Sequence, residues 1–302
     1  MQIAVAATPE VAIPTLELLL QSGKNLVSVI TQPDRPSGRG LALKETPVAL
    51  WAKERHIVVH KPNSQDELSE LVRNFDLVIT IGFGMIIKEE ILELPKFGFI
   101  NLHFSLLPRW RGAAPVQRAI EAGDAVTGVT VFQLDRGMDT GPIYRQVTVN
   151  LEEDTTSESL LRELAQLGAK PVLETINAIT MGESPRVQGS SGATRANKLS
   201  KEEGHIDWTL PAEAIERKIR AFYPNPGSWS TFRGSIIKIE KVDIHEGHTG
   251  SPGALSTINR ELIVSCGEGS LKVVDLQPSG KSVMAASSWL NGAQLKENER
   301  FE

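Results

Sequence analysis

The sequence predicts an α/β fold, a doubly wound and mostly parallel sheet followed by a small C-terminal β-barrel. In the first 181 residues, short apolar and β-branched runs alternate with segments of helical spacing. A polar stretch rich in Gly and Ser interrupts this alternation at 182–207, and short strand-like runs broken by turns follow it. We therefore expect a first domain over 1–181, a linker over 182–207 and a second domain over 208–302.

The strands expected in the first domain are near-continuous apolar runs, which is typical of a parallel sheet covered on both faces. In chain order they span 3–7, 26–31, 57–60, 77–80, 99–102, 126–134 and 143–149. A glycine-containing loop joins the last two runs, so we expect that edge of the sheet to be antiparallel. Pro14 opens the first helix, Ser64 with Glu67 forms a capping-box pattern, and a long helix over 156–181 ends the domain.

The second domain begins with a helix expected over 211–222. Five short strands are then expected, at 229–232, 236–242, 254–257, 262–266 and 271–276. Short strands separated by turns favour a small barrel, similar to the oligonucleotide-binding (OB) fold. The part of the chain from 208 to 302 carries 11 basic and 11 acidic residues, so we expect a local basic face rather than a wholly basic surface.

Composition excludes several classes of protein. The apolar runs fall far short of the roughly 20 residues that cross a bilayer, and the N-terminus lacks the basic segment of a secretory signal, so we expect a cytoplasmic protein. The one cysteine, Cys266, excludes an internal disulfide and a multi-cysteine zinc site, and we expect it to be buried in packing. His245 and His248 have no third ligand nearby, so we expect a solvated turn there and no metal.

Glycines mark two turns that follow strands. The segment after the first strand, AATP at 6–9, lacks the G-x-G-x-x-G pattern, which disfavours a nicotinamide-dependent dehydrogenase. After the fourth strand, Gly82 and Gly84 either allow a flat ligand to approach the backbone or simply make a turn.

A constellation of polar side chains follows the fifth strand. Asn101 and His103 are two residues apart on an extended run, so their side chains project from the same face. An amide beside an imidazole suits a developing oxyanion and proton transfer, although a hydrogen-bonded pair that merely closes a strand has the same pattern. Asp139, in a glycine-bounded loop, reaches the histidine only if the last strands fold back beside the fifth; otherwise it is a turn residue.

Longer strings connect these residues. They are NLHFSLLPRWRG at 101–112 and MDTG at 138–141, together with AAPVQ at 113–117, TQPDRPSGRG at 31–40, SKEEGHIDW at 200–208, RAFYP at 220–224 and LNG at 290–292. The first two resemble the formyltransferases that use 10-formyltetrahydrofolate, whose catalytic domain is a Rossmann variant. The others resemble the branch of that family that acts on methionyl initiator tRNA. The resemblance spans nearly the whole chain.

The resemblance implies a reaction and its participants. The chain would transfer a formyl group from 10-formyltetrahydrofolate, a co-substrate, to the α-amino group of methionyl initiator tRNA for translation initiation, without a metal. Asn101 and protonated His103 would stabilise the oxyanion, and Asp139 would hold His103 and help to relay a proton. The partners would be folate and initiator tRNA, with no membrane, and the chain would be a monomer.

The resemblance also implies binding residues. The folate would be bordered by Phe83, Gly84, Met85, Ile86, Ser105, Leu106, Leu107, Pro108, Arg136 and Gly137. A mobile loop carrying Arg35, Arg39 and Lys44 would contact the tRNA. The chain departs from the family pattern at Val5, Ala7 and Val11, which affects local packing.

Three other functions share part of this pattern. A formyltransferase acting on an amino sugar or a glycinamide nucleotide would share the Asn101, His103 and Asp139 set but lack the Arg39 loop. A 10-formyltetrahydrofolate hydrolase would use water as the acceptor. A non-catalytic RNA-binding module would be favoured only if one of Asn101, His103 and Asp139 were replaced, and all three are present here.

Overall fold

The structure, a computed structural model, describes residues 1–37, 42–247 and 250–302. The chain divides into two compact units. The first unit comprises Met1–Pro115, Val126–Asn150 and Leu161–Ala196, and the second comprises Val116–Ala125, Leu151–Leu160 and Asn197–Glu302. The division into domains at 181 and 208 stays a prediction.

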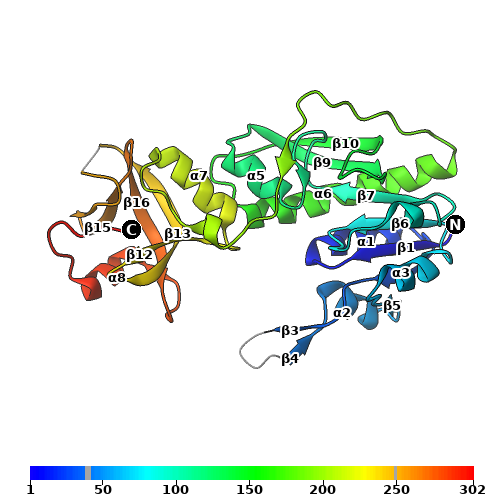
Figure 1. The fold of residues 1–302 in the computed structure, drawn as a ribbon, viewed down its shortest axis with the longest axis horizontal. Coiled ribbons are helices and arrows are strands. Elements are labelled where there is room, and N and C mark those ends of the chain that lie inside the picture. Colours follow the sequence, from blue (N-terminus) through cyan, green and yellow to red (C-terminus); the bar gives the residue numbers. More distant parts are fainter. Residues whose placement is uncertain (38–41, 248–249) are drawn as a thin grey trace. The chain divides into compact units, whose positions relative to one another are not determined.

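A seven-stranded sheet organises the first unit (Figure 1). Its order is β10-β9-β7-β6-β1-β2-β5, and all neighbours are parallel except β7 with β9 and β9 with β10. The strands are β1 (Ile3–Ala7), β2 (Leu26–Ile30), β5 (Val58–His60), β6 (Leu77–Ile81), β7 (Phe99–His103), β9 (Val126–Gln133) and β10 (Ile143–Asn150). The predicted α/β class, with an antiparallel far edge, is confirmed.

Helices separate the strands. They are η1 (Glu10–Ala12), α1 (Ile13–Gln21), α2 (Pro47–Glu54), α3 (Gln65–Val72), α4 (Glu89–Leu92), α5 (Pro115–Glu121) and α6 (Ser157–Thr180). Ser64 caps α3 as predicted, because the backbone N of Glu67 donates to Ser64 Oγ at 3.1 Å; the Glu67 side chain accepts from Asn63 N at 2.8 Å, one residue before the N-cap that a capping box would use. Helix α6 lies close to β7, since a Cβ atom at Gly168 would be 2.7 Å from Leu102 Cδ2.

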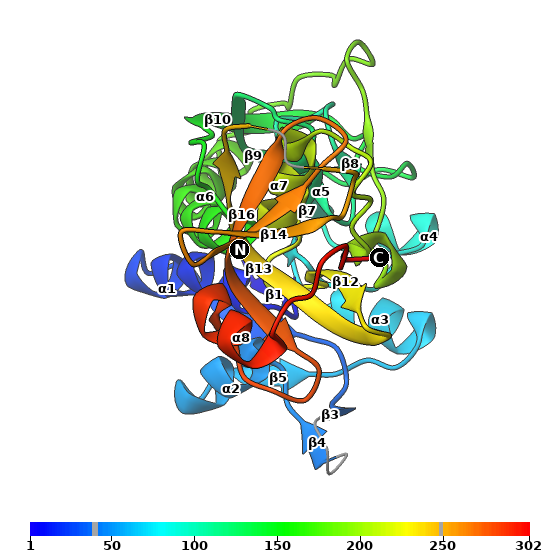
Figure 2. The ribbon, with the colours of Figure 1, turned by 90° about the vertical axis from the view of Figure 1, so that its left-hand side faces the viewer.

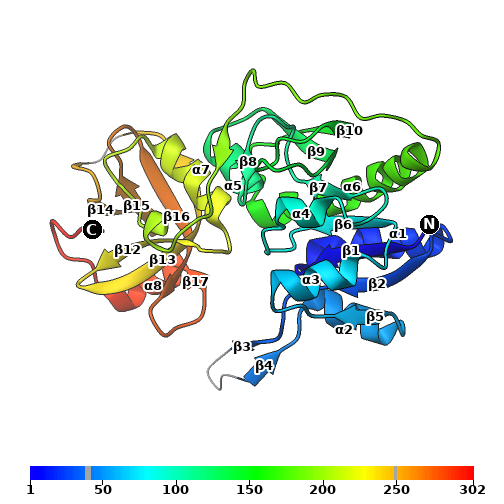
Figure 3. The ribbon, with the colours of Figure 1, turned by 45° about the vertical axis from the view of Figure 1, so that its right-hand side comes forward.

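Two short pairings in the first unit were not predicted. Strands β3 (Arg35–Ser37) and β4 (Ala42–Lys44) form an antiparallel ribbon where a loop was expected (Figure 3). Strand β8 (Arg111–Gly112) pairs in parallel with β11 (Arg195–Ala196), so part of the predicted linker is structured. Both pairings are two or three residues long, which is too short for a period-two pattern to be visible in a sequence.

The second unit is built on an antiparallel sheet of order β12-β13-β16-β15-β14, with β17 paired to β16 (Figures 2 and 3). Its elements within Asn197–Glu302 are η2 (Glu202–Gly204), α7 (Ala212–Phe222), β12 (Ser228–Phe232), β13 (Ser235–His245), β14 (Leu255–Ile258), β15 (Glu261–Ser265), β16 (Ser270–Pro278), β17 (Met284–Ala285) and α8 (Ala286–Ala293). The chain end links the two edge strands, because Thr231 N donates to Glu302 O and Leu255 N to Glu299 O, both at 2.9 Å. A barrel of OB type stays a prediction.

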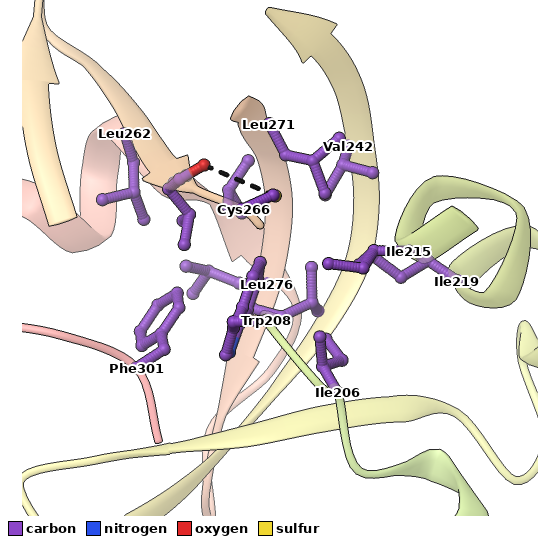
Figure 4. Packing of buried hydrophobic residues seen from close by; sticks show 14 of the residues in the cluster. Ile206, Trp208, Ile215, Ile219, Val242, Leu262, Cys266, Leu271, Leu276 and Phe301 are labelled. Carbon is purple, nitrogen blue, oxygen red and sulfur yellow. Dashed lines mark hydrogen bonds between the residues drawn. The ribbon is translucent and has the colours of Figure 1, made fainter. Parts of the chain in front are cut away.

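The core of the second unit packs around Trp208 and Phe301, whose ring centroids are 5.7 Å apart (Figure 4). Cys266 lies in this core with no solvent exposure, and burial raises the pKa of its thiol to about 11. The expected packing role of this cysteine is confirmed. Among the residues that the structure describes, no helix is long and apolar enough to span a membrane.

Candidate active site

Asn101 and His103 lie at the carboxyl end of β7, in the part of the sheet where parallel and antiparallel strands meet. Thr80 on β6 is paired in register with Asn101. The Thr80 hydroxyl donates toward Asn101 Oδ1 at 2.8 Å and toward the Ile100 carbonyl at 3.2 Å. Since the amide oxygen of Asn101 faces this donor, its Nδ2 group is the one left to donate to a ligand.

His103 is buried, and its two ring nitrogens have different neighbours. Nε2 lies 2.9 Å from the carbonyl oxygen of Trp110, and because a carbonyl only accepts, Nε2 carries a hydrogen. Nδ1 lies 3.7 Å from Asp139 Oδ2, and the edge of Phe132 packs against the ring. Nδ1 is therefore the nitrogen left to face Asp139 or a ligand.

Asp139 reaches His103 from the loop between β9 and β10. Its backbone φ is 53°, in the left-handed region that non-glycine residues rarely adopt. Its Oδ2 atom accepts a hydrogen bond of 2.7 Å from the backbone N of Gly112. Earlier in the loop, Asp135 Oδ1 accepts from Gly137 N and Thr140 Oγ1, which closes a tight turn. The structure thus brings His103 and Asp139 together; the catalytic roles stay predictions.

The turn after β7 is held by two polar side chains of the neighbouring strands. Thr130 Oγ1 accepts from Leu107 N at 3.1 Å and donates to Ser105 O at 2.7 Å, and Gln146 Nε2 donates to Leu107 O at 2.8 Å. Ser105 and Leu107 are buried, whereas Leu106 and Pro108 are half-buried. Because the Ser105 hydroxyl already bonds to Arg109 O at 2.6 Å, this side chain shapes the turn.

The turn after β6 carries the next predicted folate residues. Phe83 is buried, Met85 is half-buried, and Ile86 is 81% exposed. Gly82 must be glycine here, because its φ is +56° and a Cβ atom would lie 2.8 Å from Pro9 Cγ. Gly84, with φ +78°, and Arg136 are exposed, and Gly137 is half-buried. The folate contacts of these residues stay predictions.

Two of the three residues predicted to contact tRNA, Arg35 and Lys44, lie on the β3–β4 ribbon. Arg35 and Lys44 are exposed and pair in register across it, so they share a face. Arg39 lies outside the residues that the structure describes. Lys61 joins the two ends of the ribbon, because its Nζ lies 2.5 Å from Asp34 Oδ1 and 2.7 Å from Glu45 Oε1.

Charge neighbours at the base of the ribbon favour an ionised Glu45. Hydrogen bonds from Lys53 and from Lys61 lower the pKa of its carboxyl group below the usual value. The sequence analysis did not identify this cluster, because its members come from three separate segments of the chain.

Sequence analysis also missed the residues that hold His103 and Asp139 in place. Trp110 and Gly112 contact His103 and Asp139 through their backbones, and Gln188 donates to the carbonyl oxygens of Asp139 and Gly141. The first two lie in the string 101–112, whose resemblance to the family carries no sign of these backbone contacts. Gln188 lies in the predicted linker and had no signal in the sequence.

Metal ligation finds no support in the described part of the chain, where no group of three or more His, Cys, Asp or Glu side chains is arranged to hold an ion. His245 Nδ1 lies 3.3 Å from Ser270 Oγ, and His248 is outside the described residues.

Comparison with known proteins places this geometry in context. Residues 1–176 match the family described as formyl transferase, and residues 198–294 match the formyl transferase C-terminal domain. The chain is 41% identical over 307 residues to a methionyl-tRNA formyltransferase of Thermobifida fusca, with 100% of this chain and 99% of the relative covered. It is 46% identical over 290 residues to one of Stutzerimonas stutzeri, with 93% and 91% covered.

Solved structures share the fold at lower identity. An N-formyltransferase from Helicobacter canadensis, in complex with folinic acid and dTDP-3-aminofucose, aligns with a TM-score of 0.69 and 19% identity, covering 92% of this chain and 99% of its own. HypX from Aquifex aeolicus, in complex with tetrahydrofolic acid, aligns with a TM-score of 0.67 and 18% identity, covering 96% of this chain and 47% of its own.

Proposed function

The chain belongs to the formyl transferase family, and from this premise we propose that it transfers the formyl group of 10-formyltetrahydrofolate to the α-amino group of methionyl initiator tRNA. The likeness to methionyl-tRNA formyltransferases extends over at least 93% of the chain at 41% and 46% identity. On the chain itself, one observation carries the chemistry. The buried His103 lies beside the Asp139 carboxylate and two residues from the Asn101 amide on the same strand.

The reaction is an acyl transfer through a tetrahedral intermediate. The amine nitrogen attacks the formyl carbon, a C–N bond forms, and the formyl oxygen becomes an oxyanion. Asn101 Nδ2 and the protonated Nδ1 of His103 donate hydrogen bonds to this oxygen. The bond from the formyl carbon to the folate nitrogen then breaks, and the proton lost by the amine passes to that nitrogen, with His103 held by Asp139 for this relay.

The folate would bind along the two turns that follow β6 and β7. The exposed Ile86 side chain and the half-buried Met85 offer apolar surface to a flat ring, and Gly84 leaves the backbone uncovered beside them. The turn from Ser105 to Pro108 and the residues Arg136 and Gly137 would complete the border. The turn from Ser105 to Pro108 is already held by two bonds, because Leu107 N donates to Thr130 Oγ1 and Gln146 Nε2 donates to Leu107 O, which supports a preformed site.

The tRNA would contact the β3–β4 ribbon through Arg35, Arg39 and Lys44. Arg35 and Lys44 share one exposed face, and a guanidinium with an ammonium group suits phosphate oxygens. The C-terminal barrel would provide a further RNA contact. We also propose that the protein acts as a monomer in the cytoplasm.

Transfer of radiolabelled formyl from 10-formyltetrahydrofolate tests the proposal directly. Label should appear on methionyl initiator tRNA, and elongator methionyl-tRNA serves as the control acceptor. Label released to water, or transferred to an amino sugar or a glycinamide nucleotide with no transfer to tRNA, would replace this function with one of its alternatives.

A further inference from the structure

The segment 186–196, named the strap, forms hydrogen bonds with two loops of the first unit: the loop after β7 that carries Trp110, and the loop between β9 and β10 that carries Asp139. At one end, Arg186 forms an antiparallel bridge with Ile143. At the other end, β11 pairs with β8, and Arg111 N donates to Thr194 O at 2.9 Å. These bonds place the strap beside both loops that contact His103.

Two non-glycine residues with left-handed backbones flank His103, and both are bonded to the strap. Trp110 has φ 62° and its carbonyl oxygen faces His103 Nε2, while its backbone N donates to Thr194 Oγ1 at 2.9 Å. Asp139 has φ 53°, and its carbonyl oxygen accepts from Gln188 Nε2 at 3.1 Å. Because such backbones cost free energy, they persist only where neighbouring groups hold them.

Gln188 uses both ends of its amide. Nε2 donates to Asp139 O and, at 2.9 Å, to Gly141 O, so it joins the two residues on either side of Thr140. Oε1 accepts from Arg111 Nε at 2.9 Å and also from Nη2. A guanidinium can only donate hydrogen bonds, so the amide oxygen of Gln188 must face Arg111. The NH₂ group of Gln188 then faces the loop that carries Asp139. Gln188 is half-buried although its neighbours Val187 and Gly189 are exposed.

We propose that Gln188 is a positioning residue for formyl transfer, acting through the backbone of Asp139. Its amide fixes the left-handed turn so that the Asp139 carboxylate stays beside Nδ1 of His103. This inference rests on the proposed function.

A second glutamine provides an internal comparison. Gln146 Oε1 accepts from Arg186, and its Nε2 donates to Leu107 O at 2.8 Å, in the turn proposed to border the folate. Both glutamines are therefore oriented by an arginine and bonded to a backbone carbonyl of a site loop. The two glutamines hold different loops, so substituting them should change different kinetic parameters: kcat for Gln188 and KM for Gln146.

Two substitutions separate the donor role of Gln188 from its acceptor role. Gln188→Met keeps the length of the side chain but removes both the donor and the acceptor. Gln188→Glu still accepts from Arg111 but cannot donate to Asp139 O or Gly141 O. We expect both variants to lower kcat by about 10- to 100-fold, the scale of a misplaced catalytic group, with little change in KM for 10-formyltetrahydrofolate. Gln146→Met should instead raise that KM more than it lowers kcat.

The decisive experiment introduces Gln188→Met into the Asp139→Asn variant and compares the double variant with Asp139→Asn alone. If Gln188 acts through the Asp139 carboxylate, kcat should fall there by no more than about 2- to 3-fold. Asn74→Leu removes an amide-to-carbonyl bond of 3.1 Å at the opposite end of the sheet and should leave kcat unchanged. Thermal unfolding of every variant accompanies the kinetics.

The outcomes are distinct. Full activity of Gln188→Glu would overturn the proposal, because satisfying Arg111 would then be the whole role. The proposal would also be overturned if Gln188→Met lowered kcat by the same factor with Asp139 and with Asn at position 139. It would likewise be overturned if Gln188→Met lost activity only because it unfolds, while Gln188→Glu stayed folded and active. Absence of formyl transfer by the unsubstituted protein would contradict the proposed function instead.

Discussion

The surroundings of His103 and the β3–β4 ribbon differ in how their charged groups are held. The side chains of His103 and Asp139 are only 7% and 17% exposed, and backbone groups fix both of them. Arg35 and Lys44 are exposed, and the ribbon that carries them is tied down at its base by Lys61. A reacting centre requires fixed atoms, whereas phosphate recognition requires accessible charge. Substitutions in the first region should change kcat, and those in the second should change KM for tRNA.

The largest effect is expected for His103→Ala. Its proposed roles are to donate to the oxyanion and to relay the proton, and loss of both should lower kcat by about 100- to 1,000-fold in the radiolabel assay. Asn101→Ala should act on the same oxyanion, so the double variant should lose less than the product of the two single losses. Multiplicative losses would show that the two side chains act independently.

Asp139→Asn should follow in size. The amide keeps the shape of the side chain but loses the charge facing His103, and we expect kcat to fall by about 100-fold with folate binding retained. Isothermal titration with the folate checks binding, and single-turnover kinetics check the chemical step. Near-normal turnover would remove Asp139 from the mechanism.

Charge removal on the ribbon should have a smaller effect of a different kind. Arg35→Ala and Lys44→Ala should each raise KM for tRNA by about 3- to 10-fold, with kcat retained. The dependence of log KM on log salt should flatten by about 0.7–0.9 for each phosphate that is no longer neutralised. Arg73→Ala, an exposed change at the end of α3, is the matched control. An unchanged KM and salt slope in both ribbon variants would contradict tRNA binding by these two residues.

The smallest effect concerns Glu45 at the base of the ribbon. Its hydrogen bonds to Lys53 and Lys61 lower the pKa of the carboxyl group from the usual 4.5. A lowered pKa in the folded state contributes stability above pH 4.5 that is lost as the pH falls through the folded value. The difference in unfolding midpoint between the unsubstituted protein and Glu45→Gln should therefore be positive near pH 7 and vanish in stronger acid.

Glu54→Gln is the control for that experiment, because its carboxylate is 74% exposed and contacts Arg55 at 3.3 Å. It should give a smaller difference near pH 7. A Glu45 difference that persists unchanged below the folded pKa would show that it does not arise from this charge cluster.

The sequence by itself determined the local elements and the kinds of chemistry. Apolar periodicity located the strands of the main sheet, and Ser64 with Glu67 located the start of α3. The side-chain period of two placed Asn101 and His103 on one face of a strand. The strings around them then identified the family. All of these signals act between residues close in the chain, where the backbone itself fixes the spacing.

Only the tertiary structure decided how distant segments meet. The approach of Asp139 to His103 depends on β9 pairing with β7 in one register, and on a backbone bond from Gly112. The roles of Gln188 and Lys61 arise from hydrogen bonds to distant segments of the chain, which leave no periodic trace in a sequence. A residue that acts through such bonds can be identified only in the folded structure. Its side chain determines which donors and acceptors it carries, but the packing of the sheet determines which groups lie within hydrogen-bond distance of them.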